Sequence, residues 1–259
     1  MQFRTRSFSA LPVAALLVLV AGCGASKAST TDAAGTSAAI ERAGHPVGSG
    51  HQLKRGGPRA QAPSLGAAAT FAVLAGSTVT NTGATVVTGN LGASPGSAVT
   101  GFPPGVLRGA KHVADPMSAR AMADLTTAYN DLAGRTLAPI SVAGNIGGRT
   151  LTPGLYKSTS SLEISSGDLT LSGNGVFIFQ IASTLTTTSG RAVVLSGGAR
   201  ASNVFWQVGS SATLGTTSTF KGTIMADQSI SLNTGAKLNG RALARIGAVS
   251  LAGNTVVLP

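Results

Sequence analysis

The sequence is poor in the residues on which most enzymes and metal proteins depend. Its 259 residues include one cysteine, three histidines and eight acidic residues, and aromatic residues make up 4%. A single cysteine excludes both an intrachain disulfide and a cysteine-based metal site. Few aromatic and charged residues favour a core of small Val, Leu, Ile and Ala layers, with Ser, Thr and Asn at the surface.

Carboxylates are too sparse for the usual chemistry of polysaccharide-cleaving enzymes. From residue 64 onward the acids are Asp115, Asp124, Asp131, Glu163, Asp168 and Asp227. A β-helix lyase or hydrolase needs clustered carboxylates, a calcium site, or both. We therefore expect no enzymatic activity, no metal and no cofactor, and a polysaccharide lyase or hydrolase is the least favoured function.

The net charge of +11 does not mark a nucleic-acid-binding protein. Its Lys and Arg residues are scattered, several of them within the first 60 residues, and no basic helix or aromatic-interleaved patch is present. Nucleic acid is therefore not an expected partner. An anionic surface or simple solubility accounts better for the charge.

The N-terminus has the pattern of an export signal. Arg4 and Arg6 precede an apolar run at residues 11–20, which is followed by Ala21, Gly22 and Cys23. This order is typical of a secretory signal and resembles the bacterial lipobox, whose cysteine is lipidated and becomes the mature N-terminus. The run is too short for a standard transmembrane helix. We predict that residues 1–23 are a lipoprotein-type signal peptide and that Cys23 anchors the protein to a membrane at the cell envelope; an ordinary signal peptide, which would give a secreted protein, is the alternative.

Residues 24–63 are small, polar and rich in Pro and Gly, without apolar periodicity. Such a composition predicts a flexible linker. His45 and His51 lie within it and are expected to be solvated. We place the folded domain at residues 64–259 and expect it to be monomeric.

An 18-residue repeat organises the domain. Residues 211–246 contain two units that superpose Leu214 on Leu232 and Gly222 on Gly240. Each unit has two short segments of alternating apolar and polar residues, with Gly at the corner between them. A unit this short cannot bury a core by itself and must stack on its neighbours. The repeat therefore predicts coils of a β-solenoid.

Other segments extend this pattern. Residues 176–181 and 204–208 are equivalent apolar strands, and residues 70–88 are rich in β-branched residues with Gly corners. Residues 93–114 contain Pro95, Pro103 and Pro104, which predicts a loop.

One strong helix is predicted at about residues 115–133. Asp115 is suited to the N-cap and Pro116 to the first helical position. One apolar face is formed by Met122, Leu125, Ala128, Tyr129 and Leu132. The helix would be about 27 Å long, so we expect it to run along the solenoid axis and cover one flank, with Asp124 and Asp131 solvated.

Several motifs together resemble a known family. They are residues 71–95 (FAVLAGSTVTNTGATVVTGNLGASP), 101–105 (GFPPG), 151–156 (LTPGLY), 175–180 (GVFIFQ), 203–208 (NVFWQV) and 232–244 (LNTGAKLNGRALA). In this order, across residues 65–259, the chain resembles the bacterial and fungal ice-binding proteins of the DUF3494 type. The resemblance implies an irregular right-handed parallel β-helix of triangular section, with one long helix alongside and N-terminal strands that join the C-terminal coils.

The resemblance also implies an exported, antifreeze-like protein that adsorbs to ice through a flat Thr-bearing face and inhibits ice growth and recrystallisation. Bacterial members often carry a Thr-Ala/Gly-x-Thr/Asn motif on that face, and residues 82–85 fit it. Residues 234–237 depart from it at Lys237, and residues 216–219 depart at their second position. We predict that the ice-binding residues are Thr82, Thr85, Thr216, Thr219 and Thr234.

Two observations keep alternatives open. Thr is a good strand residue in any sheet, so a Thr by itself does not mark a site. Charged side chains such as Lys237, Arg191 and Asp168 would disturb ordered water if they lay on the same face. A cell-surface adhesion or polymer-binding module without ice activity is therefore the alternative function.

Overall fold

The computed structural model describes residues 60–259. They form one long helix, two short 3-10 helices and three sheets in which every strand pair is parallel. The predicted signal peptide, Cys23 and all but the last residues of the predicted linker lie outside the described residues. Within residues 60–259, no helix is both long and apolar enough to cross a membrane.

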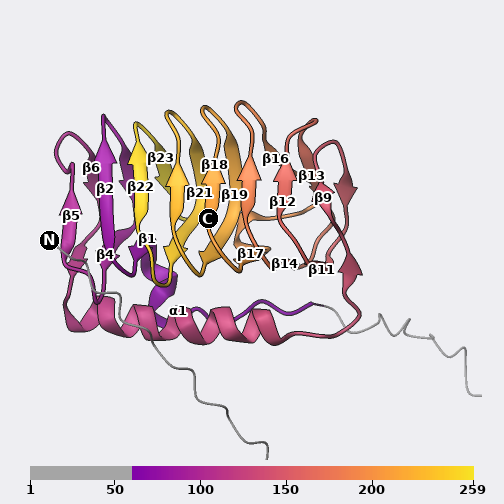
Figure 1. Ribbon diagram of the computed structural model, residues 1–259, viewed down its shortest axis with the longest axis horizontal. Coiled ribbons are helices and arrows are strands. Elements are labelled where there is room, and N and C mark those ends of the chain that lie inside the picture. The colour runs from indigo at the N-terminus through magenta and orange to yellow at the C-terminus, as the bar shows by residue number, and fades with distance from the viewer. Residues whose placement is uncertain (1–59) are drawn as a thin grey trace, which may run out of the picture. The chain divides into compact units, whose positions relative to one another are not determined.

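An eight-stranded sheet forms one side of the solenoid. In spatial order its strands are β5 (Ala98–Thr100), β2 (Thr78–Thr82), β22 (Val249–Ala252), β20 (Ile230–Leu232), β18 (Ala212–Leu214), β15 (Leu185–Thr187), β12 (Leu162–Ile164) and β9 (Gly144–Asn145). Figure 1 shows β5, β2, β22, β18, β12 and β9 as a row of parallel arrows.

A twelve-stranded sheet and a three-stranded sheet form the other sides. The larger sheet runs β6 (Val106–Arg108), β3 (Val86–Thr88), β23 (Thr255–Val257), β21 (Lys237–Ala244), β19 (Thr219–Ala226), β17 (Val204–Val208), β14 (Phe177–Ile181), β11 (Gly154–Ser158) and β8 (Ile140–Ser141), and it is joined by β1 (Phe71–Ala75), β4 (Asn90–Ala93) and β7 (Lys111–Val113). The smaller sheet consists of β10 (Thr150–Leu151), β13 (Leu169–Ser172) and β16 (Val193–Ser196). The 3-10 helices are η1 (Gly66–Thr70) and η2 (Ala201–Asn203).

The 18-residue register is confirmed by the pairing of the two longest strands. In the ladder between β19 and β21, Phe220 lies opposite Leu238, and Gly222 opposite Gly240. A Cβ on Gly222 would lie 2.6 Å from the carbonyl oxygen of Val204, and the backbone there has φ 104°. Only glycine fits that corner without strain. Each of these strands therefore continues around a corner of the solenoid as one element.

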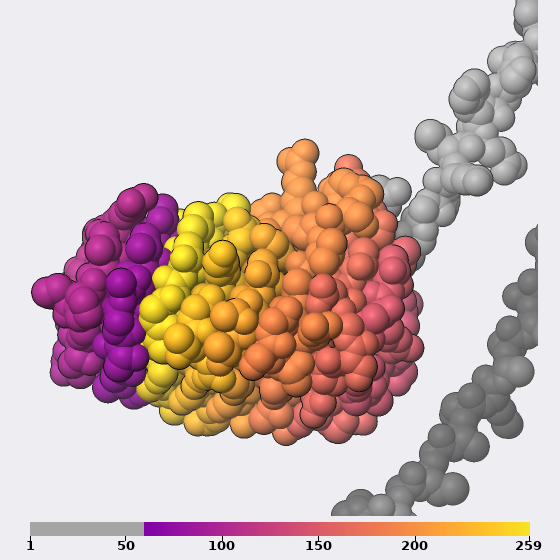
Figure 2. Space-filling view, turned by 90° about the horizontal axis from the view of Figure 1, so that it is seen from above, coloured from indigo at the N-terminus to yellow at the C-terminus, as the bar shows by residue number. Residues whose placement is uncertain are grey.

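The N-terminal strands join the C-terminal coil, as the family resemblance implies. β1 pairs with β21, β2 with β22 and β3 with β23. The indigo coil consequently lies beside the yellow coils in Figure 1, and the same order of colour bands is visible on the surface in Figure 2. The first and last parts of the domain are thus held together by backbone hydrogen bonds.

The prediction of a loop at residues 93–114 is wrong. This segment contains β5, β6 and β7, which pair with β2, β3 and β4 and form a further coil. Pro95, Pro103 and Pro104 lie in the turns between these strands, where a missing backbone donor costs no ladder hydrogen bond. The prolines predicted the turns of this segment correctly, but they gave no indication of the three-residue strands next to those turns.

Helix α1 (Pro116–Gly134) confirms the predicted start and position. The Asp115 carboxylate accepts the Ser118 N–H at 2.7 Å, and Pro116 is the first helical residue. The helix runs along the strand stack in Figure 1. Its buried face consists of Ser118, Ala121, Leu125, Ala128, Tyr129 and Leu132. The helix thereby covers the apolar residues that one side of the twelve-stranded sheet turns outward.

The prediction that the helix carboxylates are solvated is wrong for Asp124, whereas the Asp131 side chain is exposed as predicted. Asp124 accepts the backbone N–H of Ala67 at 2.7 Å and so attaches η1 to the helix. Asp131 forms an ion pair with Arg135 at 2.6 Å. Both carboxylates have partners in the fold, so neither is free for chemistry.

Four of the nine aromatic residues within residues 60–259 form one column inside the coils. The ring centroids are 5.1 Å apart for Tyr156 and Phe179, 3.9 Å for Phe179 and Trp206, and 5.0 Å for Trp206 and Phe220. Tyr156, Phe179 and Trp206 lie opposite one another in the ladders of β11, β14 and β17, so each ring packs on the ring of the next coil. Phe220 adds a tilted contact from β19, four residues before Ile224, which is the ladder partner of Trp206. This stacking fixes the relative positions of the coils and therefore of the side chains on the outer faces.

Candidate functional site

The eight-stranded sheet presents an outer surface of short, mostly uncharged side chains, which we call the hydroxyl face. Its strands alternate strictly: Ala212 and Leu214 point into the core while Thr213 is half-exposed, and Ile230 and Leu232 flank Ser231 in the same way. Alternation follows from the two-residue period of a strand. Each coil therefore places one polar side chain at the centre of the strand on the outside.

These central side chains form a straight row, which we call the central row. Following the ladder from strand to strand, it contains Thr100, Thr80, Ser250, Ser231, Thr213, Thr186, Glu163 and Asn145. Neighbouring strands lie about 4.8 Å apart. The first six members carry hydroxyl groups, so the row is a regular array of hydroxyls on six adjacent strands.

Most of these hydroxyls have no role in holding the fold together. Thr80 Oγ1 donates to Ser250 Oγ at 3.3 Å. Within residues 60–259, the side chains of Thr100, Ser231, Thr213 and Thr186 make no hydrogen bond to another residue. Their hydroxyls are therefore available to a partner outside the protein.

A second row, at the start of the same strands, is used by the fold instead. Ser211 Oγ accepts the N–H of Ser229 at 3.3 Å, and Ser229 Oγ accepts the N–H of Ala248 at 3.2 Å. Thr184 Oγ1 donates to Ser161 Oγ at 2.8 Å. These half-buried hydroxyls tie one coil to the next, which keeps the strands of the hydroxyl face in a fixed register.

A shallow groove of about 370 Å³ lies on the hydroxyl face beside the central row. It is lined by Thr80, Thr82, Thr216, Ser231, Leu232, Asn233, Thr234, Ser250, Leu251 and Ala252. Thr82, Thr216 and Thr234 are exposed at its border. The structure thus brings three of the five predicted threonines together.

The other two predicted threonines do not lie on this face. Thr85 is fully buried, and its Oγ1 accepts the N–H of Asn254 at 3.0 Å. Thr219 begins β19 in the twelve-stranded sheet, opposite Lys237. The prediction of an outward position is therefore wrong for Thr85, whereas Thr219 is half-exposed but on a different side of the solenoid from Thr82 and Thr216. In each case the chain turns the corner between two sheets within the motif, so its first and last threonines belong to different sides.

The same corner keeps charged side chains away from the hydroxyl face. Lys237 lies on β21 in the twelve-stranded sheet, and Asp168 pairs with Arg191 at 3.7 Å in the turns that leave the eight-stranded sheet. Among the strand residues of the eight-stranded sheet, Glu163 is the one charged side chain. Sequence reasoning missed the central row, although tripeptides such as Ala212-Thr213-Leu214 and Ile230-Ser231-Leu232, 18 residues apart, carried its signal.

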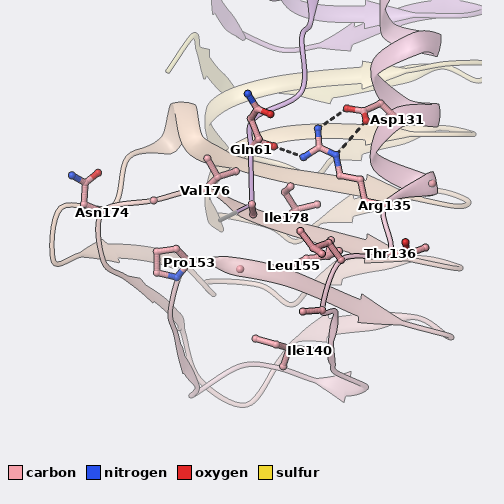
Figure 3. A pocket seen from close by; sticks show the side chains of 16 residues that line it. Gln61, Asp131, Arg135, Thr136, Ile140, Pro153, Leu155, Asn174, Val176 and Ile178 are labelled. Atoms are coloured by element: carbon pink, nitrogen blue, oxygen red, sulfur yellow. Dashed lines mark hydrogen bonds and ion pairs between the residues drawn. The ribbon is translucent and has the colours of Figure 1, made fainter. Parts of the chain in front are cut away.

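A larger hollow of about 1,220 Å³ lies near the end of α1 and is mainly apolar. Leu155, Val176 and Ile178 line it together with the exposed Ile140 (Figure 3). Its charged groups, Asp131 and Arg135, are paired with each other, and Arg135 also donates to the carbonyl oxygen of Gln61. Nothing in this lining resembles a nucleophile with its base.

The ionisable groups with displaced pKa values lie away from the hydroxyl face. Burial raises the pKa of Tyr129 and of Tyr156, and burial lowers the pKa of Arg241. The bond from the Ser118 N–H, with a further bond from His112, lowers the pKa of Asp115 to about 2. Within residues 60–259, no group of three or more His, Cys, Asp or Glu side chains is placed to hold a metal ion.

Comparisons with known proteins agree with this architecture. A family model described as ice-binding-like matches residues 73–257. An ice-binding protein of Nostoc sp. (strain HG1) is 49% identical over 197 residues, covering 74% of this chain and 72% of the relative. One from Flavobacterium frigoris (strain PS1) is 42% identical over 213 residues, covering 76% of each chain.

Solved structures give the same result. An ice-binding protein from an Antarctic biological consortium superposes with a TM-score of 0.76 and 60% identity, covering 77% of this chain and 92% of the other. An ice-binding protein from an Arctic yeast superposes with a TM-score of 0.72 and 34% identity, covering 76% of this chain and 94% of the other. With its parallel coils, flanking helix and family match over residues 73–257, the chain belongs to the ice-binding-like family.

Proposed function

We propose that this protein binds ice through the hydroxyl face and thereby inhibits ice growth and recrystallisation. The observation that carries the proposal is the central row, in which six hydroxyl side chains stand on six adjacent strands. The relatives named above are described as ice-binding proteins. Thr82, Thr216 and Thr234 would extend the contact along the groove beside the row.

The physical basis is the match between a regular surface and ordered water. Ice presents no charge, only a lattice of donors and acceptors, so a ligand must offer short groups at fixed spacing. Threonine offers a hydroxyl and a methyl group, and its β-branching leaves few rotamers, so little side-chain entropy is lost on contact. Strands about 4.8 Å apart and alternate residues about 6.6 Å apart supply the fixed spacing.

The other sides of the solenoid fit ice less well. Helix α1 covers one of them. The side formed by β6, β3, β23 and the first halves of β21 and β19 carries Arg108, Lys237 and Lys221 among its outward residues. A charged side chain retains its own hydration shell, which opposes a lattice contact. The hydroxyl face is therefore the favoured surface.

The proposed location is outside the cell. The signal-like order of Arg4, Arg6, the apolar run at residues 11–20 and Cys23 supports export and a lipid anchor at Cys23. An anchored ice-binding domain would act at the cell surface, and residues 24–59 would separate it from the membrane. We expect the domain to act as a monomer and to have no catalytic activity.

A polymer-binding or adhesive module remains the second candidate, because function resides in sites rather than folds. The exposed hydroxyls of the central row could also form hydrogen bonds with the hydroxyl groups of a polysaccharide. Binding to an insoluble polysaccharide that persists when ice activity is absent would support this second function.

One experiment tests the proposal directly. Purified protein and the variant Ser231→Tyr are compared for thermal hysteresis and for inhibition of ice recrystallisation. A tyrosine at the middle of the central row would hold the face away from a flat lattice, so activity should be lost. Thr255→Tyr is the matched control, because Thr255 is exposed on β23 in the twelve-stranded sheet. Equal activity of Ser231→Tyr and the unmodified protein, with folding verified by circular dichroism, would refute the assignment.

A further inference from the structure

We infer that Glu163 limits the ice-binding face at one end and that its carboxylate reduces the activity of this protein. The inference rests on the proposed function and adds to it the extent of the working surface. Glu163 occupies the central row, between Thr186 on β15 and Asn145 on β9. Every position from Thr186 to Thr100 in this row carries a hydroxyl. The regular array therefore stops at one particular side chain.

The Glu163 carboxylate has no ion-pair partner among the described residues. The residue is exposed at the middle of β12, between the buried Leu162 and Ile164. Within residues 60–259 it forms no ion pair and no hydrogen bond with another side chain. Removing an unpaired carboxylate from water is costly, so an ice surface brought against it would have to leave its hydration shell intact. Contact should therefore end one strand before Glu163.

The position beyond Glu163 does not restore the array. Asn145 Oδ1 accepts the backbone N–H of Gly147 at 2.9 Å and that of Ser165 at 3.0 Å. This amide is used to close the turn after β9. The usable row thus runs from Thr100 to Thr186, six strands and about 24 Å at the usual strand spacing.

A threonine at position 163 would lengthen the row by one strand, to about 29 Å. Leu162 and Ile164 would keep their places in the core, because the substitution changes only the outward residue of β12 and threonine is a good strand residue. One more methyl and hydroxyl would reach the lattice, and the charge that opposes contact would be gone. Burial of about one methyl group corresponds to roughly fourfold in an equilibrium constant.

The test compares the full chain with Glu163→Thr and Glu163→Gln. For each protein we would measure thermal hysteresis, the lowest concentration that stops ice recrystallisation, and the fraction incorporated into a slowly grown ice crystal. Glu163→Thr should lower the recrystallisation end point by about fourfold. Glu163→Gln removes the charge but keeps the length, and should fall between Glu163→Thr and the unmodified protein.

Lys157→Thr is the matched control. Lys157 belongs to the same coil as Glu163, is exposed, and lies on β11 in the twelve-stranded sheet. Exchanging this charge for threonine should leave all three measurements unchanged. A gain in Lys157→Thr equal to that of Glu163→Thr would mean that removing an exposed charge from any side of the solenoid has the same effect, and would overturn the inference.

Failure of the inference can be told apart from failure of the proposed function. If Ser231→Tyr abolishes activity while Glu163→Thr and Glu163→Gln match the unmodified protein, the face is correct and its proposed limit is wrong. If the unmodified protein is not incorporated into ice and Ser231→Tyr behaves identically, the ice-binding assignment fails, and with it the role of Glu163. A gain of activity cannot result from misfolding, so a positive result needs no further variant.

Discussion

Thr217 occupies, one coil away, the same left-handed backbone position as Gly235. Their φ angles are 56° and 71°, and the N–H of Thr217 is bonded to the carbonyl oxygen of Thr234 at 2.9 Å. The corresponding corners of other coils have Gly83, Gly190 and Gly253, all with positive φ. A β-branched residue in this conformation is strained. Thr217 is thus the exception in a column of glycines.

We predict that Thr217→Gly stabilises the protein by about 1 kcal/mol, the usual cost of a non-glycine residue held in this region. For a domain of this size the midpoint of thermal unfolding should rise by about 2–4 °C. Differential scanning calorimetry would measure it. The reciprocal change, Gly235→Thr, should lower the midpoint. The cause would be backbone strain at φ 71° and not a steric clash, since a Cβ on Gly235 would lie at an ordinary 3.6 Å from Thr217 Cγ2. A lower midpoint for Thr217→Gly would contradict the prediction.

Gln180 closes the C-terminal end of helix α1. Its Nε2 donates to the carbonyl oxygens of Leu132 at 2.5 Å and Arg135 at 2.8 Å, and its side chain is buried. We predict that Gln180→Leu lowers the free energy of unfolding by about 1–3 kcal/mol, because buried carbonyls lose their donor. Urea unfolding would measure the change. Lys157→Leu, on the adjacent strand at the exposed position paired with Gln180, should change stability by less than about 0.5 kcal/mol.

We predict that the stability of the fold depends on pH through the Asp115 carboxyl at the start of α1. The bond from the Ser118 N–H, and then that from His112, lowers the pKa of this carboxyl from 3.8 to about 2. A lowered native pKa means that the native state binds fewer protons than the unfolded state, so Asp115 stabilises the fold above about pH 4. This contribution should disappear as the pH falls from about 4 to about 2.

The variant Asp115→Asn isolates that contribution. Asparagine can still cap the helix but does not titrate in this range. The difference in unfolding midpoint between the unmodified protein and Asp115→Asn should therefore shrink as the pH is lowered through this window. A difference that stays constant from pH 5 to pH 2 would show that the Asp115 carboxyl is not responsible.

We predict that a lipid on Cys23 anchors the protein to a membrane. With its own leader, the unmodified protein should be found in the membrane fraction and should incorporate labelled fatty acid, and Cys23→Ser should do neither. A Cys23→Ser variant that is exported and distributed like the unmodified protein would favour an ordinary signal peptide. Ser29→Ala, in the predicted linker, controls for unspecific effects of a substitution near the N-terminus.

Some features of this protein are determined by local sequence. The 18-residue register between β19 and β21 follows from alternating apolar residues and the corner glycines Gly222 and Gly240, because inward side chains must repeat at the coil period. The start of α1 follows from Asp115 and Pro116, whose chemistry acts within one helical turn. These signals are local, so a single sequence is sufficient to read them.

The composition of the outer face was decided by the tertiary structure. Thr82 and Thr85 belong to one motif, but the chain turns a corner between them, and Thr85 enters the core where it binds Asn254. A shift of one residue exchanges the inner and outer sides of a strand, so the end of a strand must be known before its threonines can be assigned. Likewise, Glu163 and Thr186 are 23 residues apart and become neighbours only through the ladder between β12 and β15. The sequence determined the solenoid, whereas the closure of each coil decided which hydroxyls share a surface.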